Sequence, residues 1–214
     1  RILQARSSVE PSVPVGVDLE SDELAFFPLL YWPITPEQVI PSGRAYSRLN
    51  TYLRSGGVIL FDTRDGDIAV SGNTLNSSLV ELTRPLDIPR LEPVPIDHVL
   101  TRTFYLIKNF PGRYTNGKLW VQAIGLYSSA PELTALSRLN DGVTPILIGG
   151  NDWAGAWAVD AIGRPSFPVG RGYAGERQRE MAYRFGVNLI MYALTGNYKS
   201  DQVHVPALLD RLGK

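Results

Sequence analysis

Two apolar runs joined by a helical pattern constrain the fold of this chain more than any other feature. The first run, ELAFFPLLYWPI, spans residues 23–34, and the second, VILF, spans residues 58–61. Apolar runs of this length are typical of strands that are buried on both faces. Because a helical pattern separates them, we expect a βαβ unit with parallel strands and a right-handed crossover.

The helical pattern between the two runs has a start signal and a stop signal. Ser42 is a candidate N-cap. Apolar residues then recur at helical spacing on one face, at Ala45, Leu49, Tyr52 and Leu53. Gly56 and Gly57 predict the end of the helix, one of them by adopting the positive φ of the residue that follows a helix C-cap.

The middle of the chain is less regular. NTLNSSLVEL (73–82) reads as a short helix capped by Asn73, and four prolines predict an extended, irregular path over residues 84–96. HVLTRTFYLI (98–107) fits either a short helix or a strand. KLWVQAIGLY (118–127) and VTPILIGG (143–150) read as further strands.

A broad apolar stripe predicts one long helix near the end of the chain. It runs through Met181, Phe185, Leu189 and Ala193, and Gly196 is expected to end it. Together the elements predict one α/β domain over residues 1–214. We expect a three-layer architecture in which helices flank a mainly parallel sheet.

Composition excludes several classes of function. Lys plus Arg equals Asp plus Glu at 21 each, so no global field favours nucleic acid. The chain has no cysteine, which excludes disulfides, thiolate zinc sites and a cysteine nucleophile. No zinc-ligand spacing or EF-hand loop occurs, and GRGYAG (170–175) lacks the flanking strands of a dinucleotide fingerprint. We therefore predict no metal, no cofactor and no catalytic residue.

Polar residues follow two of the predicted strands. Asp62, Arg64 and Asp65 come after VILF, and Asn151 and Asp152 come after PILI. Because ligands of open parallel sheets bind outside the carboxyl ends of the strands, these residues are predicted to line one concave site. The alternative for Asp62 is a structural role as a cap of the following turn, with Arg64 paired to a neighbouring carboxylate.

Two tryptophans and one arginine complete the predicted ligand-binding set. Trp153 and Trp157 offer flat faces that would suit a sugar or polyol, although large aromatic side chains more often pack beneath a loop. Arg171 lies where a glycine-rich turn enters the last helix, whose free amides would suit an anionic or hydroxyl-rich ligand.

Four segments resemble a known but uncharacterised family. AFFPLLYWPI, YLRSGGVILFDTRDGD, GGNDWAGAWA and REMAYRFGVNLIMYALTGNYKSDQVH resemble the C-terminal domain of large bacterial membrane proteins that carry an N-terminal double-transmembrane region. The resemblance implies tethering to the bacterial inner membrane with this domain facing the periplasm. It also implies that RILQARSSVEP is the remainder of a longer first helix.

A more distant similarity is to the class I glutamine-amidotransferase-like superfamily, in particular its trehalose-utilisation-type branch. GGVILFD, DHVLTRTFYL and the closing helix correspond in order, which implies a flavodoxin-like fold. Amidotransferase activity needs a cysteine nucleophile, which this chain lacks. That branch also tends to have Gly-His where this chain reads Gly150-Asn151.

Two functions follow from these observations. The first is a non-catalytic module that binds a small polar ligand, such as a carbohydrate, or a protein partner. The alternative is a carbohydrate-active hydrolase or transferase that uses Asp62, Asp65 or Asp152 as acid and base. Two carboxylates across one pocket would favour the enzyme, whereas carboxylates held in salt bridges would favour the module.

Overall fold

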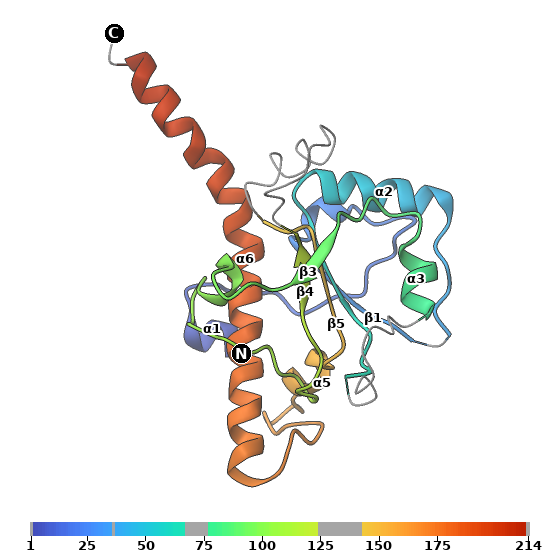
Figure 1. Cartoon of the computed structure of the whole chain (residues 1–214). Helices are drawn as coiled ribbons and strands as arrows, with labels where there is room; N and C mark the ends of the chain where they lie inside the picture. Colours follow the sequence, from blue (N-terminus) through green and yellow to red (C-terminus); the bar gives the residue numbers. More distant parts are fainter. Residues whose placement is uncertain (1, 36, 67–76, 124–142, 213–214) are drawn as a thin grey trace.

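The computed structural model describes residues 2–35, 37–66, 77–123 and 143–212, with the backbone alone for 196–212. A five-stranded sheet forms its centre (Figure 1). In spatial order the strands are β1 (Leu29–Pro33), β2 (Val58–Asp62), β5 (Ile146–Gly149), β4 (Trp120–Gln122) and β3 (Leu91–Pro93).

The sheet is mixed, which corrects the prediction of a mainly parallel sheet. β1–β2 and β2–β5 pair in parallel, whereas β5–β4 and β4–β3 are antiparallel. β3 lies at the edge, within the proline-rich stretch for which we predicted an irregular path. An edge strand tolerates proline because one side of it has no ladder to complete. The periodicity of such three-residue strands carries no information about their direction.

The predicted βαβ unit is confirmed. α2 (Gly43–Arg54) connects β1 to β2, and the Ser42 hydroxyl accepts a hydrogen bond from the N–H of Ala45 at 3.1 Å. Gly56 has a φ of +93°, as expected for the residue after the C-cap. A Cβ at Gly57 would lie 2.3 Å from the ring of Tyr52, so the chain turns tightly into β2.

Both faces of β2 and β5 are buried, as their continuous apolar runs predict. The same prediction is wrong for the first run, because β1 lies at the edge of the sheet and Leu30 is its one buried residue. Ile59 and Phe61 of β2 face the cluster that contains α2 and α3 (Ser77–Thr83). Val58 and Leu60 face the opposite cluster, which contains α6 (Gly172–Leu212). The helices therefore cover opposite faces of the sheet, and the carboxyl end of β2 is enclosed between them.

α6 continues past Gly196 to Leu212, so the prediction that Gly196 ends the helix is wrong. One glycine inside a helix costs about 1 kcal/mol relative to alanine, which is too little to stop a helix by itself. Within the described residues, no helix is both long enough and apolar enough to cross a membrane.

The remaining elements are short. They are α1 (Ile2–Arg6), η1 (Leu24–Phe26), η2 (Val99–Thr101) and α5 (Trp153–Trp157). The first apolar run thus divides into η1 and β1, and the ambiguous run at 98–107 contains one 3-10 turn. Asn73 and residues 124–127 lie outside the described residues.

Candidate functional site

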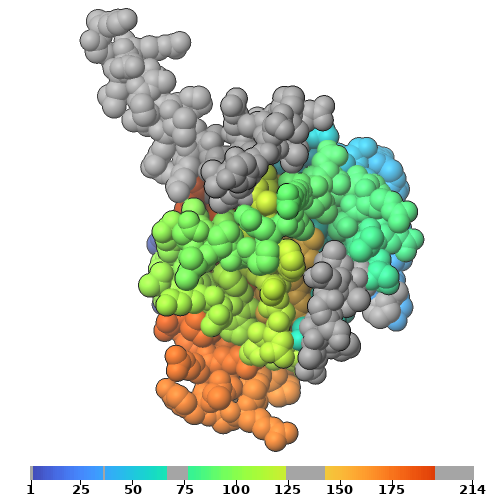
Figure 2. Space-filling model, viewed as in Figure 1, coloured from blue at the N-terminus to red at the C-terminus, as the bar shows by residue number. Residues whose placement is uncertain are grey.

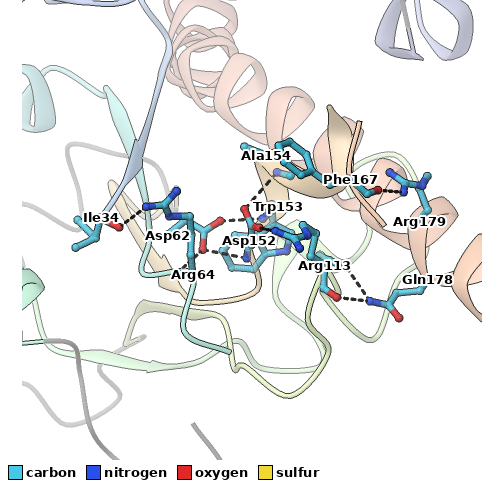
Figure 3. Close-up of polar contacts among 12 residues, drawn as sticks. Ile34, Asp62, Arg64, Arg113, Asp152, Trp153, Ala154, Phe167, Gln178 and Arg179 are labelled. Atoms are coloured by element: carbon cyan, nitrogen blue, oxygen red, sulfur yellow. Dashed lines mark hydrogen bonds and ion pairs between the residues drawn. The ribbon is translucent and has the colours of Figure 1, made fainter. Parts of the chain in front are cut away.

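Asp62 is the centre of a buried polar junction at the carboxyl edge of the sheet (Figure 3). Its carboxylate accepts hydrogen bonds from the hydroxyl of Tyr31 at 2.6 Å and from the N–H of Arg64 at 3.1 Å. It also accepts from the N–H groups of Asp152 at 3.2 Å and Trp153 at 2.8 Å. One side chain thus links β1, the end of β2 and the segment that follows β5. We refer to Tyr31, Asp62, Arg113, Asp152 and Trp153 as the Asp62 junction.

Burial controls the electrostatics of Asp62. Loss of water around the carboxylate raises the pKa of Asp62 above its usual value, and the hydrogen bonds from Tyr31 and the three amides oppose that rise. Burial, followed by the negative charge of Asp62, likewise raises the pKa of the Tyr31 hydroxyl. Tyr31 therefore remains a neutral donor, and its oxygen accepts the N–H of Ala154 at 3.3 Å.

Asp152 is held from two sides. It has a left-handed backbone with a φ of +51°, and its carboxylate accepts the N–H of Gly155 as the N-cap of α5. The same carboxylate forms a salt bridge with Arg113 at 2.8 Å. The Arg113 guanidinium also lies over the rings of Tyr114 and Phe167. This carboxylate is therefore occupied by donors from the protein itself.

Asn151 fixes the adjoining loop rather than facing a cavity. Its amide donates to the carbonyls of Phe110 and Gly117, and its oxygen accepts the N–H of Gly117 at 2.9 Å. Glycines allow this approach, because a Cβ at Gly112 would lie 2.1 Å from the carbonyl oxygen of Asn151. At Gly117 a Cβ would lie 2.6 Å from Oδ1 of Asn151.

The two tryptophans pack against the body of the protein. Trp153 is fully buried, donates its indole N–H to the carbonyl of Phe110 at 2.9 Å, and contacts Phe185 of α6. Trp157 is half-buried and donates its indole N–H to the carbonyl of Ala182. Trp153 therefore packs beneath a loop, which was the alternative to ligand binding, and its ring is not exposed to a ligand.

Polar side chains remain at the surface above the junction. Arg64 is exposed, has a φ of +56°, and donates one N–H to the carbonyl of Ile34 at 3.0 Å. Asp65 is half-buried and accepts the hydroxyl of Thr63. Thr115 and Asn116 are exposed on the loop that packs beside them. We refer to Arg64, Asp65, Thr115 and Asn116 as the junction rim.

Arg171 lies apart from this rim, exposed at the start of α6. The helix contacts the junction through Phe185, which packs on Trp153, and through Gln178, which donates to the carbonyls of Gly112 and Arg113 (Figure 3). The structure thus brings Asp62, Asp152 and Trp153 together by direct hydrogen bonds. Arg64 and Asp65 lie next to them and nearer the surface.

Sequence reasoning missed Tyr31 and Arg113. Tyr31 stands inside an apolar run and has the pattern of a core residue, and Arg113 stands in an irregular loop without periodicity. Their partners are 31 and 39 residues away along the chain. Only the parallel register, which places Tyr31 opposite Leu60, two residues before Asp62, offers a signal, and only once the strand pairing is known.

The hydrogen bonds and the salt bridge at this edge of the sheet are better suited to stabilising the fold than to acid–base chemistry. A general acid or base needs a carboxylate that reaches a substrate proton, whereas Asp62 and Asp152 are both engaged by internal donors. Among the residues that the structure describes, no group of three acidic or histidine side chains lies close enough to hold a metal ion.

Comparison of the sequence with family profiles gave a match over most of the chain. The profile of a domain of unknown function, DUF4159, matches residues 1–194. That range contains every residue of the Asp62 junction and ends beside Tyr192 and Ala193, buried residues of α6. A search of curated proteins gave no match.

Proposed function

The chain belongs to the DUF4159 family, and on that premise we propose that it is a non-catalytic module that binds a protein partner or a small polar ligand at the junction rim. One observation carries this proposal: the Asp62 and Asp152 carboxylates are both held by donors of the protein itself. They serve as cross-links of the sheet edge, and the groups left to meet a ligand are those of the rim.

The rim has the chemistry of a recognition surface. Arg64 offers a guanidinium and Asp65 a carboxylate, and the exposed Thr115 and Asn116 add a hydroxyl and an amide. Donors and acceptors together on one surface suit a polar ligand or partner, which can pair with both. The balanced charge of the chain supports the exclusion of nucleic acid.

We also propose the cellular setting and the wider relationship that the sequence implies. The domain is tethered to the inner membrane of a bacterium and faces the periplasm, as in the membrane proteins that its segments resemble. Its fold is related to the flavodoxin-like, three-layer fold of the class I glutamine-amidotransferase-like superfamily. The parallel β1–β2–β5 core with helices on both faces supports that relationship.

A thermal-shift screen of sugars, polyols, nucleotides and peptidoglycan fragments tests the binding function. A ligand at about 100 times its Kd adds about 2.7 kcal/mol to the free energy of unfolding. We expect the variant with both Arg64→Ala and Asp65→Asn to lose that shift, and the control Lys108→Ala, at another exposed site, to keep it. Turnover of a glycoside that disappears in Asp65→Asn would replace this proposal with the hydrolase alternative.

A further inference from the structure

Residues 159–175 form an exposed end of the molecule that contacts the Asp62 junction through Phe167, whose ring lies against Arg113. Figures 1 and 2 show this segment, in orange, at the lower end of the view, where the turn after α5 meets the start of α6. Pro165 and Pro168 of the turn line one hollow together with Gly172 and Gly175 of the helix, so the two stretches adjoin.

Hydrogen bonds within residues 160–164 define the turn. One carboxylate oxygen of Asp160 accepts the N–H groups of Ile162 at 3.0 Å and Arg164 at 2.8 Å. The backbone N–H of Asp160 donates to the carbonyl of Arg164 at 2.8 Å, and Gly163 supplies a φ of +86°. These bonds close the turn on itself, and Ile162 at its tip is exposed.

Large apolar side chains are presented to solvent at this end. Ile162 is 70% exposed and Tyr173 is 80% exposed. Phe167 is 46% exposed, with its ring against the Arg113 guanidinium. Isolated apolar residues at a surface are ordinary, but several within one exposed segment indicate a site of contact with a partner or a membrane.

Exposed arginines lie close to these side chains along the chain. Arg164, Arg171 and Arg177 are exposed, and residues 159–179 contain four arginines against Asp160 and Glu176. The fourth arginine, Arg179, donates to the carbonyls of Ala156 and Phe167 within the protein. A stretch with net positive charge stands out in a chain whose formal net charge is zero.

We propose that this end of the molecule docks onto an anionic lipid bilayer. Ile162 and Tyr173 enter the interface between headgroups and acyl chains, and Arg164, Arg171 and Arg177 bind lipid phosphates.

The chemistry of these side chains suits the membrane interface. Tyrosine fits that depth because its ring is apolar and its hydroxyl remains hydrated. Basic side chains beside an anionic surface add attraction within a Debye length. Separate apolar side chains of this kind fit a fluid interface better than the continuous apolar core of a protein–protein contact. This inference does not depend on the function proposed for the junction rim.

Binding to vesicles of phosphatidylglycerol and phosphatidylcholine tests the proposal. We expect co-sedimentation with mixed vesicles, weaker binding at high salt, and little binding to pure phosphatidylcholine. Replacing Arg164, Arg171 and Arg177 together with glutamine should weaken binding about 100-fold, at roughly fivefold per charge. Ile162→Ser should weaken it about tenfold. Phe26→Ser, at a residue that is 81% exposed on another part of the surface, and Lys108→Gln are the controls and should bind as the unaltered protein does.

The absence of cysteine allows a direct test of insertion. A fluorophore that reports polarity, attached to Ile162→Cys, should shift to the blue with phosphatidylglycerol vesicles, whereas the same label on Phe26→Cys should not. Circular dichroism of each variant shows that the fold is kept. The proposal would be overturned by no binding to anionic vesicles or by equal binding of all variants. It would also be overturned if the emission of the label at position 162 did not shift to the blue. Binding only to vesicles that carry membrane protein would assign the surface to a protein partner and overturn it as well.

Discussion

The hydroxyl of Tyr31 donates a 2.6 Å hydrogen bond to the carboxylate of Asp62, a contact that joins two adjacent parallel strands. The same carboxylate accepts the N–H of Trp153, 91 residues further along the chain, at 2.8 Å. The polar edge of the sheet is therefore one hydrogen-bonded unit, centred on a carboxyl group that water does not reach.

Replacing Asp62 should lower the free energy of unfolding more than replacing its partner Tyr31. Asp62→Asn turns one acceptor into a donor that faces other donors, and we expect a loss of about 3 kcal/mol or more in the free energy of unfolding. Tyr31→Phe removes one hydrogen bond to the carboxylate and should cost about 1–2 kcal/mol. Urea unfolding measures both, with Tyr173→Phe as an exposed control that should cause no change.

A double-mutant cycle separates this connection from general damage. If Tyr31 and Asp62 act as a unit, the costs of the two substitutions should fall short of additivity by about 1 kcal/mol. Additive costs would mean that the 2.6 Å contact contributes nothing specific and that the two residues stabilise the edge independently.

The glycine at position 112 should be intolerant of any side chain. A Cβ there would lie 2.1 Å from the carbonyl oxygen of Asn151, a backbone atom that cannot move without its loop. We expect Gly112→Ala to cost at least about 2 kcal/mol. The matched control is Gly16→Ala, because nothing lies within 4 Å of a Cβ at that position. Equal melting temperatures for the two variants would contradict the close approach of these loops.

The βαβ unit was predictable because its signals are local. Ser42, the apolar helix face and Gly56 each act within a few residues of their own positions, and the structure confirms all three. The antiparallel strands β3 and β4 were not predictable, because short strands carry no sign of direction and depend on pairing between distant segments. The prediction at Gly196 failed for a different reason: a single glycine is a weak stop signal, and the helix continues through it.

The edge containing the junction was predictable in location but not in its contacts. Two strands that end in polar residues indicated that Asp62 and Asp152 lie near one another, and a hydrogen bond joins them. That the Asp62 carboxylate would be filled by internal donors depended on Tyr31 and Trp153, which look like core residues in the sequence. Hydrophobic patterning cannot distinguish a buried tyrosine that only packs in the core from one whose hydroxyl also donates a hydrogen bond.

The left-handed backbone at Arg64 gives a prediction about strain. A side chain at a φ of +56° costs about 1 kcal/mol or more relative to glycine. Arg64→Gly should therefore be more stable than Arg64→Ala, since both lose the bond to Ile34 and only alanine keeps the strain. The comparison uses denaturant midpoints at equal slope. An alanine variant at least as stable as the glycine variant would show that this residue leaves the left-handed region in solution.

His98 gives a prediction about pH. The side chain is buried beside the ring of Tyr192, and its Nδ1 accepts the N–H of Leu100 at 3.2 Å. Burial lowers the pKa of His98 below its usual value of 6.5, and the negative charges of Asp97 and Glu92 oppose that shift only in part. The folded protein therefore binds this proton less readily than the unfolded chain does.

The sign of the pH effect follows from that difference. The contribution of neutral His98 to stability is fully present above about pH 6.5 and is lost as the pH falls from there toward its lower pKa in the folded state. In His98→Asn the side-chain oxygen replaces Nδ1 as acceptor but does not titrate. We expect the difference in free energy of unfolding between the unaltered protein and this variant to shrink between pH 7.5 and about pH 5, when both are measured by urea titration. A difference that stays constant over that range would show that His98 titrates alike in the folded and unfolded chains, and that its burial beside Tyr192 imposes no penalty on the charged form.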